Sequence, residues 1–302
     1  MGRKICGEIR QMKKVRKRKM VIVLGIFLVI AGAVAIWFNI PYSPVKRQFQ
    51  NDIASLLAEN RLSVAKEQFT KEDFAHLPAA IQRYMENCGY IGTQKMSSLK
   101  MEYHNVAFSQ GQNGPVLSID YTQYNFVDEP CRVALIDSRM FGIPFEGYDY
   151  YQNGTGGMKG VIAKAVTLFD QTGEEMDQAC LVTFLAESMF APTILLQDYI
   201  TFEEISDFEV RATISYKGQT ASGIFTFNDQ YEMVSFTTND RAIAGSDGSM
   251  EYVPWSAICS NYKPAGNGIK YPTKFQAIWN YADGDFVYFD GVISEVSYGY
   301  VI

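Results

Sequence analysis

The feature that most constrains this chain is an uninterrupted apolar segment close to its N-terminus. Residues 20–38 are 19 consecutive positions without a charge. As an α-helix rising about 1.5 Å per residue, this segment spans roughly 28 Å, close to the thickness of the hydrocarbon core of a bilayer. Pro41 follows and favours the end of the helix, because proline lacks a backbone N–H. The sequence therefore predicts a single transmembrane helix over residues 20–38.

Positive charge is concentrated directly before this segment. Residues 1–19 carry nine basic side chains and one acid, Glu8, for a net +8. The whole chain carries −6, so the part after the segment carries −14. Lys and Arg beside a span remain on the cytoplasmic side, which predicts a cytoplasmic tail over 1–19 and a C-terminal domain that is extracytoplasmic. The basic residues are Arg3, Lys4, Arg10, Lys13, Lys14, Arg16, Lys17, Arg18 and Lys19.

A cleavable signal peptide is the alternative interpretation of the same segment. Ala33-Val34-Ala35 has the small residues of a cleavage site. The apolar segment is longer than the usual core of a signal peptide, however, and Ile36, Trp37 and Phe38 continue it. We therefore expect an uncleaved anchor in the cell membrane, with cleavage after Ala35 as the alternative.

The remaining 260 or so residues have the composition of a globular α+β domain. Apolar residues make up 47% of the chain and aromatic residues 14%, which excludes disorder. The acidic exterior argues against nucleic acid as a partner. Residues 42–92 predict a helical, membrane-proximal region, because Phe49, Ile53, Leu56 and Leu57 follow one helical face. Pro78 would begin a further helix there, and Gly89 would end it.

Residues 93–302 alternate between apolar and polar side chains and predict an antiparallel, β-rich domain. Hairpin turns are expected at Lys217-Gly218 and Asp283-Gly284. A glycine-rich turn near Asn153-Gly154 should precede a strand over 161–168. Residues 174–196 interrupt the strands and predict a buried helix. The expected fold is a large curved sheet, a half-barrel, with helices packed on one face.

The cysteines do not have the spacing of a metal site. Cys88, Cys131, Cys180 and Cys259 are far apart in the sequence and form no C-x-x-C pair. Two disulfides or four free thiols are both compatible with this spacing, whereas Cys6 falls on the predicted cytoplasmic side. We expect no metal and no cofactor.

The sequence offers no recognisable catalytic constellation. Its two histidines, His76 and His104, are not paired with a nucleophile at a diagnostic spacing. No G-x-S-x-G, H-E-x-x-H or phosphate-binding loop motif is present. We nominate no catalytic residue, although the absence of a motif does not exclude a hydrolase.

Four side chains are weak candidates for a ligand-binding site. Glu187 lies in an apolar helical segment, where a buried carboxylate requires a partner. Arg241 or Arg83 could supply the opposite charge, and a structural ion pair is the simpler explanation. Trp255 and Trp279 could stack on a ligand, although a core position is the more common one for tryptophan.

Several short segments together resemble an uncharacterised bacterial family, a domain of unknown function. The resemblance extends over roughly residues 75–300 and implies the fold without implying a reaction. The pattern of sheet and helices also resembles the LolA-type half-barrels that carry lipoproteins. The matching segments are Leu77-Pro78, Arg83-Tyr84, Gly89, Leu185-Ala186-Glu187, Phe190, Pro192-Thr193, Leu195-Leu196, Asp240-Arg241, Pro254-Trp255, Tyr271-Pro272 and Trp279.

Two classes of function follow from these observations. The first is a membrane-anchored extracytoplasmic domain that binds or carries an apolar ligand, such as a lipid or lipoprotein. The second is an interaction module that contacts a protein partner of a cell-envelope complex and has no ligand cavity. The two differ in whether the curved sheet encloses a cavity.

Overall fold

The computed structural model describes residues 2–60, 67–109, 111–112, 114–244, 249–265 and 268–300. The chain divides into two compact units, residues 1–42 and residues 43–302. We describe each unit separately and refer to them as unit 1 and unit 2.

Unit 1 consists of one long helix, α1 (Gly2–Asn39). Its apolar side chains between Met20 and Ile36 are largely exposed. Within the described residues, this N-terminal region has the one helix that is long and apolar enough to cross a membrane.

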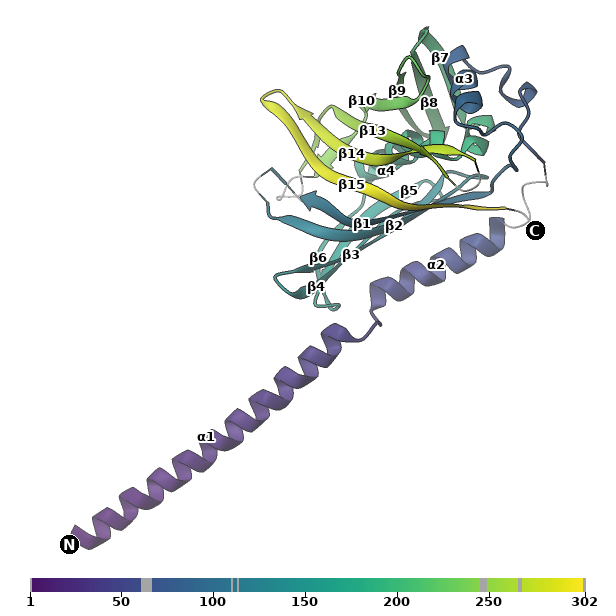
Figure 1. Cartoon of the computed structure of the whole chain (residues 1–302). Helices are drawn as coiled ribbons and strands as arrows, with labels where there is room; N and C mark the ends of the chain where they lie inside the picture. Colours follow the sequence, from purple (N-terminus) through teal and green to yellow (C-terminus); the bar gives the residue numbers. More distant parts are fainter. Residues whose placement is uncertain are drawn as a thin grey trace. The chain divides into compact units, whose positions relative to one another are not determined.

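Unit 2 is built around a 13-stranded antiparallel sheet with the order β6-β5-β4-β3-β2-β1-β15-β14-β13-β10-β9-β8-β7 (Figure 1). The predicted α+β class with a large antiparallel sheet is therefore confirmed. A separate hairpin joins β11 (Ala242–Ala244) to β12 (Met250–Tyr252). The other strands are β1 (Ser98–Ser109), β2 (Val116–Phe126), β3 (Cys131–Met140), β4 (Ile143–Gln152), β5 (Thr155–Ile162), β6 (Val166–Gln171), β7 (Ile200–Ser206), β8 (Glu209–Tyr216), β9 (Gln219–Phe227), β10 (Met233–Thr238), β13 (Trp255–Pro264), β14 (Lys270–Tyr281) and β15 (Gly284–Gly299).

The hairpin turns show which parts of the strand prediction hold. Lys217 and Gly218 both have positive φ, at 48° and 86°, as a tight two-residue turn between twisted strands requires. The predicted strand over 161–168 is wrong, because Ala163 and Lys164 also have positive φ and turn the chain between β5 and β6. Neither residue is a usual turn former, so local sequence does not predict this turn.

The described helices of unit 2 are α2 (Pro44–Asn60), α3 (Ala79–Asn87) and α4 (Glu174–Glu187), with short 3₁₀ segments at Glu72–Phe74, Ser188–Phe190 and Pro192–Leu196. α4 lies in the connection between β6 and β7, the two edge strands of the sheet. It contacts β4 and β5 on one arm and β8 and β9 on the other. The sheet therefore curls around α4 and forms a half-barrel that this helix fills (Figure 1).

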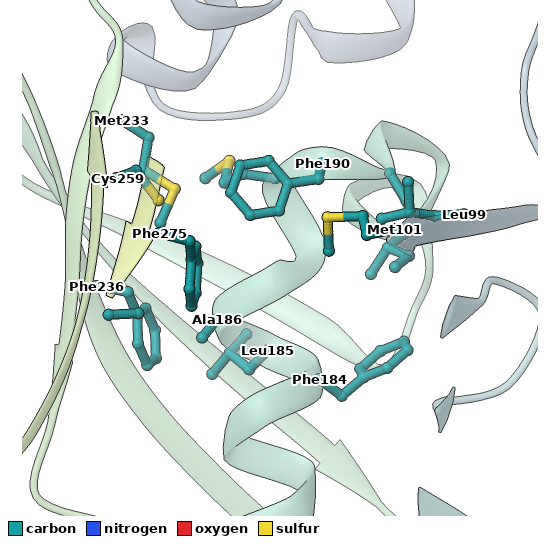
Figure 2. Packing of buried hydrophobic residues seen from close by; sticks show 14 of the residues in the cluster. Leu99, Met101, Phe184, Leu185, Ala186, Phe190, Met233, Phe236, Cys259 and Phe275 are labelled. Atoms are coloured by element: carbon teal, nitrogen blue, oxygen red, sulfur yellow. The ribbon is translucent and has the colours of Figure 1, made fainter. Parts of the chain in front are cut away.

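The sequence of α4 explains why it lies inside the sheet. From Ala179 onward its side chains are buried on every side except at Thr183, so this part of the helix has no polar face to turn toward water. The predicted buried helix over 174–196 is thus confirmed in part, because the helix ends at Glu187 and 3₁₀ segments follow at Ser188–Phe190 and Pro192–Leu196. Figure 2 shows its side chains at the centre of the core, with Phe236, Cys259 and Phe275 on one side of the helix and Leu99 and Met101 on the other.

Gly156 allows α4 to approach β5 closely. A Cβ atom at this position would lie 2.7 Å from the Cβ atom of Cys180 and 3.0 Å from the carbonyl oxygen of Met176. The backbone N–H of Gly156 also donates to Asp177 Oδ1 at 2.6 Å. Gly156, which the sequence places in a glycine-rich turn, therefore lies on β5 and allows the close packing of α4 against this strand.

α2 covers the opposite face of the sheet. Val45, Phe49 and Ile53 pack against Val133 and other residues that point away from α4, in a second, smaller apolar cluster. The predicted helical stripe is confirmed, and it explains why side chains on both faces of β3 are buried. The helices thus occupy both faces of the sheet, with α2 outside and α4 inside, so the predicted placement of all helices on one face is wrong.

The four cysteines of unit 2 are free and buried, at Cys88, Cys131, Cys180 and Cys259. Burial raises the pKa of Cys88 and of Cys131 to about 12. All four thiols behave as small apolar groups of the core.

We expect Gly156→Ala to destabilise unit 2 by about 1–3 kcal/mol, because the added methyl group overpacks the contact with α4. Urea denaturation of the full chain followed by circular dichroism measures the change. Gly111→Ala is the matched control, since nothing lies within 4 Å of a Cβ atom there. Equal stability of the two variants would contradict the close packing of α4 on β5.

Candidate functional site

A cavity of about 120 Å³ lies between α4 and the inner face of the sheet. Three of the four predicted candidates, Glu187, Arg241 and Trp255, line it together, whereas Trp279 does not. The wall is otherwise mainly aromatic and aliphatic. The remaining lining residues are Tyr103, Phe108, Tyr121, Gln123, Arg132, Ile136, Asp149, Met158, Thr183, Ala186, Phe275, Ala277, Tyr288 and Phe289.

Glu187 belongs to a buried ion network at one end of the cavity. Its Oε2 accepts hydrogen bonds from Arg132 Nε at 3.0 Å and from Asn125 Nδ2 at 2.9 Å. Arg132 Nη1 donates to Asp149 Oδ2 at 2.7 Å, and Arg132 Nη2 donates to the hydroxyl of Tyr121. Burial opposes the charge of Arg132, but the carboxylates of Asp149 and Glu187 outweigh burial and raise its pKa. The network therefore fixes the C-terminal end of α4 to β2, β3 and β4.

The prediction of the residue that pairs with Glu187 is wrong. Arg241 and Arg83 were the predicted partners, yet Arg132 on β3 pairs with Glu187. Arg83 instead lies 4.8 Å from the centre of the Tyr231 ring. Alternation along β3 does not single out Arg132, because both faces of this strand are buried. The available signal was a charged residue directly before the apolar run Val133–Ile136 of this strand.

Arg241 occupies a different place in the cavity wall. Its guanidinium carbon lies 4.7 Å from the ring centre of Trp255 and 5.6 Å from that of Trp279. Nη1 donates to Ala179 O at 2.8 Å and to the hydroxyl of Thr183, whereas the buried Nε has no hydrogen-bond partner among the described residues. No carboxylate oxygen in the described part of the chain forms a salt bridge with Arg241. The cation is thus held by π faces and neutral oxygens.

The two tryptophans form the support for this guanidinium. Trp255 and Trp279 are register partners on β13 and β14. Trp279 stacks on Tyr288 with ring centres 5.8 Å apart, and Trp255 Nε1 donates to Tyr288 Oη at 3.1 Å. Trp279 therefore does not line the cavity itself but supports Arg241, which does.

Two tyrosine hydroxyls of the wall are held in their neutral form by burial. Burial raises the pKa of Tyr103 and of Tyr121, in the second case despite the neighbouring Arg132. Burial likewise raises the pKa of the Cys180 thiol, which lies 3.9 Å from Asp149 Oδ1. A protonated thiol is a poor nucleophile, so Cys180 is not an activated catalytic cysteine.

The groups that most often take part in catalysis are sparse in this cavity wall. Both histidines lie outside the cavity wall, and His104 is exposed beside Asp120, with Nδ1 3.3 Å from Oδ1. The described residues contain no group of three or more His, Cys, Asp or Glu side chains placed to hold a metal ion. The cavity wall thus combines apolar side chains, tyrosine hydroxyls and one guanidinium, that of Arg241, which forms no salt bridge with the residues that the structure describes.

Comparison with protein families gives one match. A family model described as "Family of unknown function (DUF6544)" matches residues 67–291. A search of the curated proteins found no match.

Two solved structures resemble the chain at 10% sequence identity. A candidate outer membrane lipoprotein-sorting protein domain from Vibrio parahaemolyticus has a TM-score of 0.39, with 72% of this chain and 91% of that chain covered. A DUF1329 family protein from Desulfovibrio piger has a TM-score of 0.40, with 77% and 94% covered.

We expect Arg132→Met to destabilise unit 2 by about 3–5 kcal/mol, because it leaves the carboxylates of Glu187 and Asp149 without their buried partner. Chemical denaturation at neutral pH measures the loss. Arg211→Met is the control, since Arg211 forms only an exposed ion pair with Glu203. If both variants lost the same small amount, Arg132 would not be the partner that holds this network.

Proposed function

The chain belongs to the DUF6544 family of unknown function, and we propose from its site that unit 2 binds a small amphipathic anion inside the half-barrel. The apolar part of the ligand would occupy the cavity beside Phe275 and Phe289. Its anionic group would meet the guanidinium of Arg241. We further propose that α1 remains in the cell membrane as a single-pass anchor and holds unit 2 outside the cytoplasm.

The observation that carries this proposal is the incomplete hydrogen bonding of the buried Arg241 guanidinium. A cation in a largely apolar wall is costly unless it is paired or hydrogen-bonded. The two indole faces offset part of that cost, since a cation over an aromatic face gains about 0.5–2 kcal/mol. The buried Nε still has no partner among the described residues. An oxygen of an anionic ligand would complete its hydrogen bonding.

The volume of the cavity limits the size of the ligand. An engineered protein cavity of about 150 Å³ holds one benzene molecule. The cavity here, at about 120 Å³, therefore suits one ring or one short alkyl chain. The several acyl chains of a lipoprotein would require α4 to leave the sheet. Among the predicted lipid-like ligands we thus favour a single-chain anion.

The charge distribution supports the proposed topology. Residues 1–19 carry +8 and the residues after the apolar segment carry −14, which favours a cytoplasmic N-terminus. The alternative of an interaction module without a ligand cavity does not account for the space beside α4. We retain it as the conclusion that a failed ligand experiment would favour.

We expect the full chain in detergent to bind octanoate about 10- to 100-fold more tightly than octanol, because a hydrogen bond to a charged group contributes about 1.5–3 kcal/mol. The two probes have the same chain length, and octanoate is ionised at pH 7. Fluorescence of Trp255 and Trp279, which contact Arg241, reports binding. Isothermal titration calorimetry provides an independent measure.

Three variants test the assignment of roles. Arg241→Gln should bring octanoate down to the affinity of octanol, and Arg211→Gln should leave both unchanged. Ala277→Leu should weaken both probes, because it fills the cavity while the charge remains. If neither probe bound saturably to the folded protein, or if Arg241→Gln left the preference for octanoate intact, the proposed ligand class would be wrong.

The anchor leads to a separate expectation. Protein isolated from membranes should have its complete N-terminal sequence, because an anchor is retained and a signal peptide is removed. Mass spectrometry of the intact chain distinguishes the two. A mature N-terminus at Ile36 would show cleavage after Ala35 and would remove the membrane tether from the proposal.

A further inference from the structure

The turn between β3 and β4 has an unusual side chain at its tip. Phe141 is 90% exposed, and its neighbours Met140 and Ile143 are also apolar. Phe141 has a φ of 52°, a left-handed conformation that costs free energy for a bulky residue. Gly142 follows at a φ of 83° and completes the turn. Phe141 thus incurs a conformational cost without gaining contacts in the core.

The course of α2 shows which end of unit 2 this turn occupies. Lys46, in the first turn of α2, lies 2.5 Å from Asp137 and 4.0 Å from Glu146. These two residues are register partners on β3 and β4, close to the turn at Phe141. Tyr148, further along β4, donates to Asp52 Oδ2 at 2.6 Å. α2 therefore starts near Phe141 and runs along β4.

The far end of α2 confirms this direction. Leu56, Glu59 and Asn60 line a surface pocket together with Asn153, in the turn that follows β4. β4 has 10 residues, so the turns at its two ends are about 33 Å apart. The chain consequently enters unit 2 at the end that carries Phe141 and leaves α2 at the end that carries Asn153.

The short connection between the two units limits the distance between the start of unit 2 and the predicted membrane span. Five residue steps separate Phe38, the last residue of the apolar segment, from Ser43, the first residue of unit 2. Extended chain covers at most about 3.3–3.6 Å per residue, so the connection reaches roughly 17 Å. If α1 is retained as the proposed anchor, a tether this short would limit how far the start of α2 can move away from the bilayer.

Further exposed apolar side chains occur at the same end of the sheet. Val116, 70% exposed, begins β2, and the β2–β3 register places it level with the turn at Phe141. Val166 and Leu168 on β6 are 56% and 49% exposed. Val166 is the register partner of Ile162, which pairs with Phe145 near the same turn.

We propose that this end of unit 2, with Phe141 at its tip, contacts the surface of the lipid bilayer. The proposal depends on the retention of α1 as an anchor. Phe141 would insert at the interface, where an exposed aromatic side chain is removed from water. The cavity extends toward the same end, because Phe108 lines it and is the register partner of Leu117 at the start of β2. A membrane-derived amphiphile would therefore enter from the lipid side.

Site-specific labelling of the full chain in lipid nanodiscs tests this contact. Cys6→Ser removes the thiol of the N-terminal tail, and the four described cysteines of unit 2 are buried. An environment-sensitive dye is then placed at Phe141→Cys or at Asn153→Cys. Asn153 is the matched control, because it is exposed, has a φ of 54° and precedes a glycine in a turn at the other end of β4.

We expect lipids that carry a quencher to reduce the dye emission at position 141 several-fold more than at position 153. Equal quenching at both positions would overturn the proposal. A dye at Val166→Cys should likewise be quenched, and Phe141→Asn should reduce that quenching. Asn tolerates positive φ, so this variant should keep or raise the unfolding temperature. Unchanged quenching at position 166 would show that Phe141 makes no membrane contact.

Octanoate titration of the same nanodisc samples separates this proposal from the ligand proposal. Octanoate binding with equal quenching at 141 and 153 would reject the membrane contact and leave the proposed ligand in place. Selective quenching at 141 without octanoate binding would reject the ligand and support the contact.

Discussion

The structure of unit 2 depends on the enclosure of one apolar helix. From Ala179 onward α4 has no polar face apart from Thr183, so this part of the helix requires apolar contacts on nearly every side. A flat sheet can cover only one side of a helix, whereas a curled sheet of 13 strands covers several. Because α4 connects the two edge strands, its position also sets the separation of the two arms. The cavity is the space that remains where the helix and the curved sheet do not meet.

The two arginines of the cavity have different roles. Arg132 is neutralised by Glu187 and Asp149 and fixes α4 to the sheet. Arg241 forms no salt bridge among the described residues and rests on Trp255 and Trp279. A buried ion pair specifies geometry but has little affinity left for a ligand. Arg241, which rests on an aromatic support, is therefore the group that we expect to gain an interaction with a ligand.

Much of this architecture was predictable from the sequence, because local patterns determine it. The helical stripe at Phe49 and Ile53, the turn at Lys217-Gly218 and the all-apolar segment of α4 depend on neighbouring residues alone. The β5–β6 turn was missed because Ala163 and Lys164 adopt positive φ without the usual turn residues. The pairing of Arg132 with Glu187 was missed because it joins residues 55 positions apart through the curvature of the sheet. That Arg241, Trp255 and Glu187 share one cavity is likewise a property of the folded sheet.

The free thiols described above have a practical consequence for the biogenesis of this domain. Cys88, Cys131, Cys180 and Cys259 are each enclosed in the core as unpaired sulfhydryl groups. The native state of unit 2 therefore needs no oxidising folding machinery, whichever compartment it reaches. Reductants should leave its stability unaltered, and it can be produced in a reducing cytosol without reshuffling of covalent cross-links.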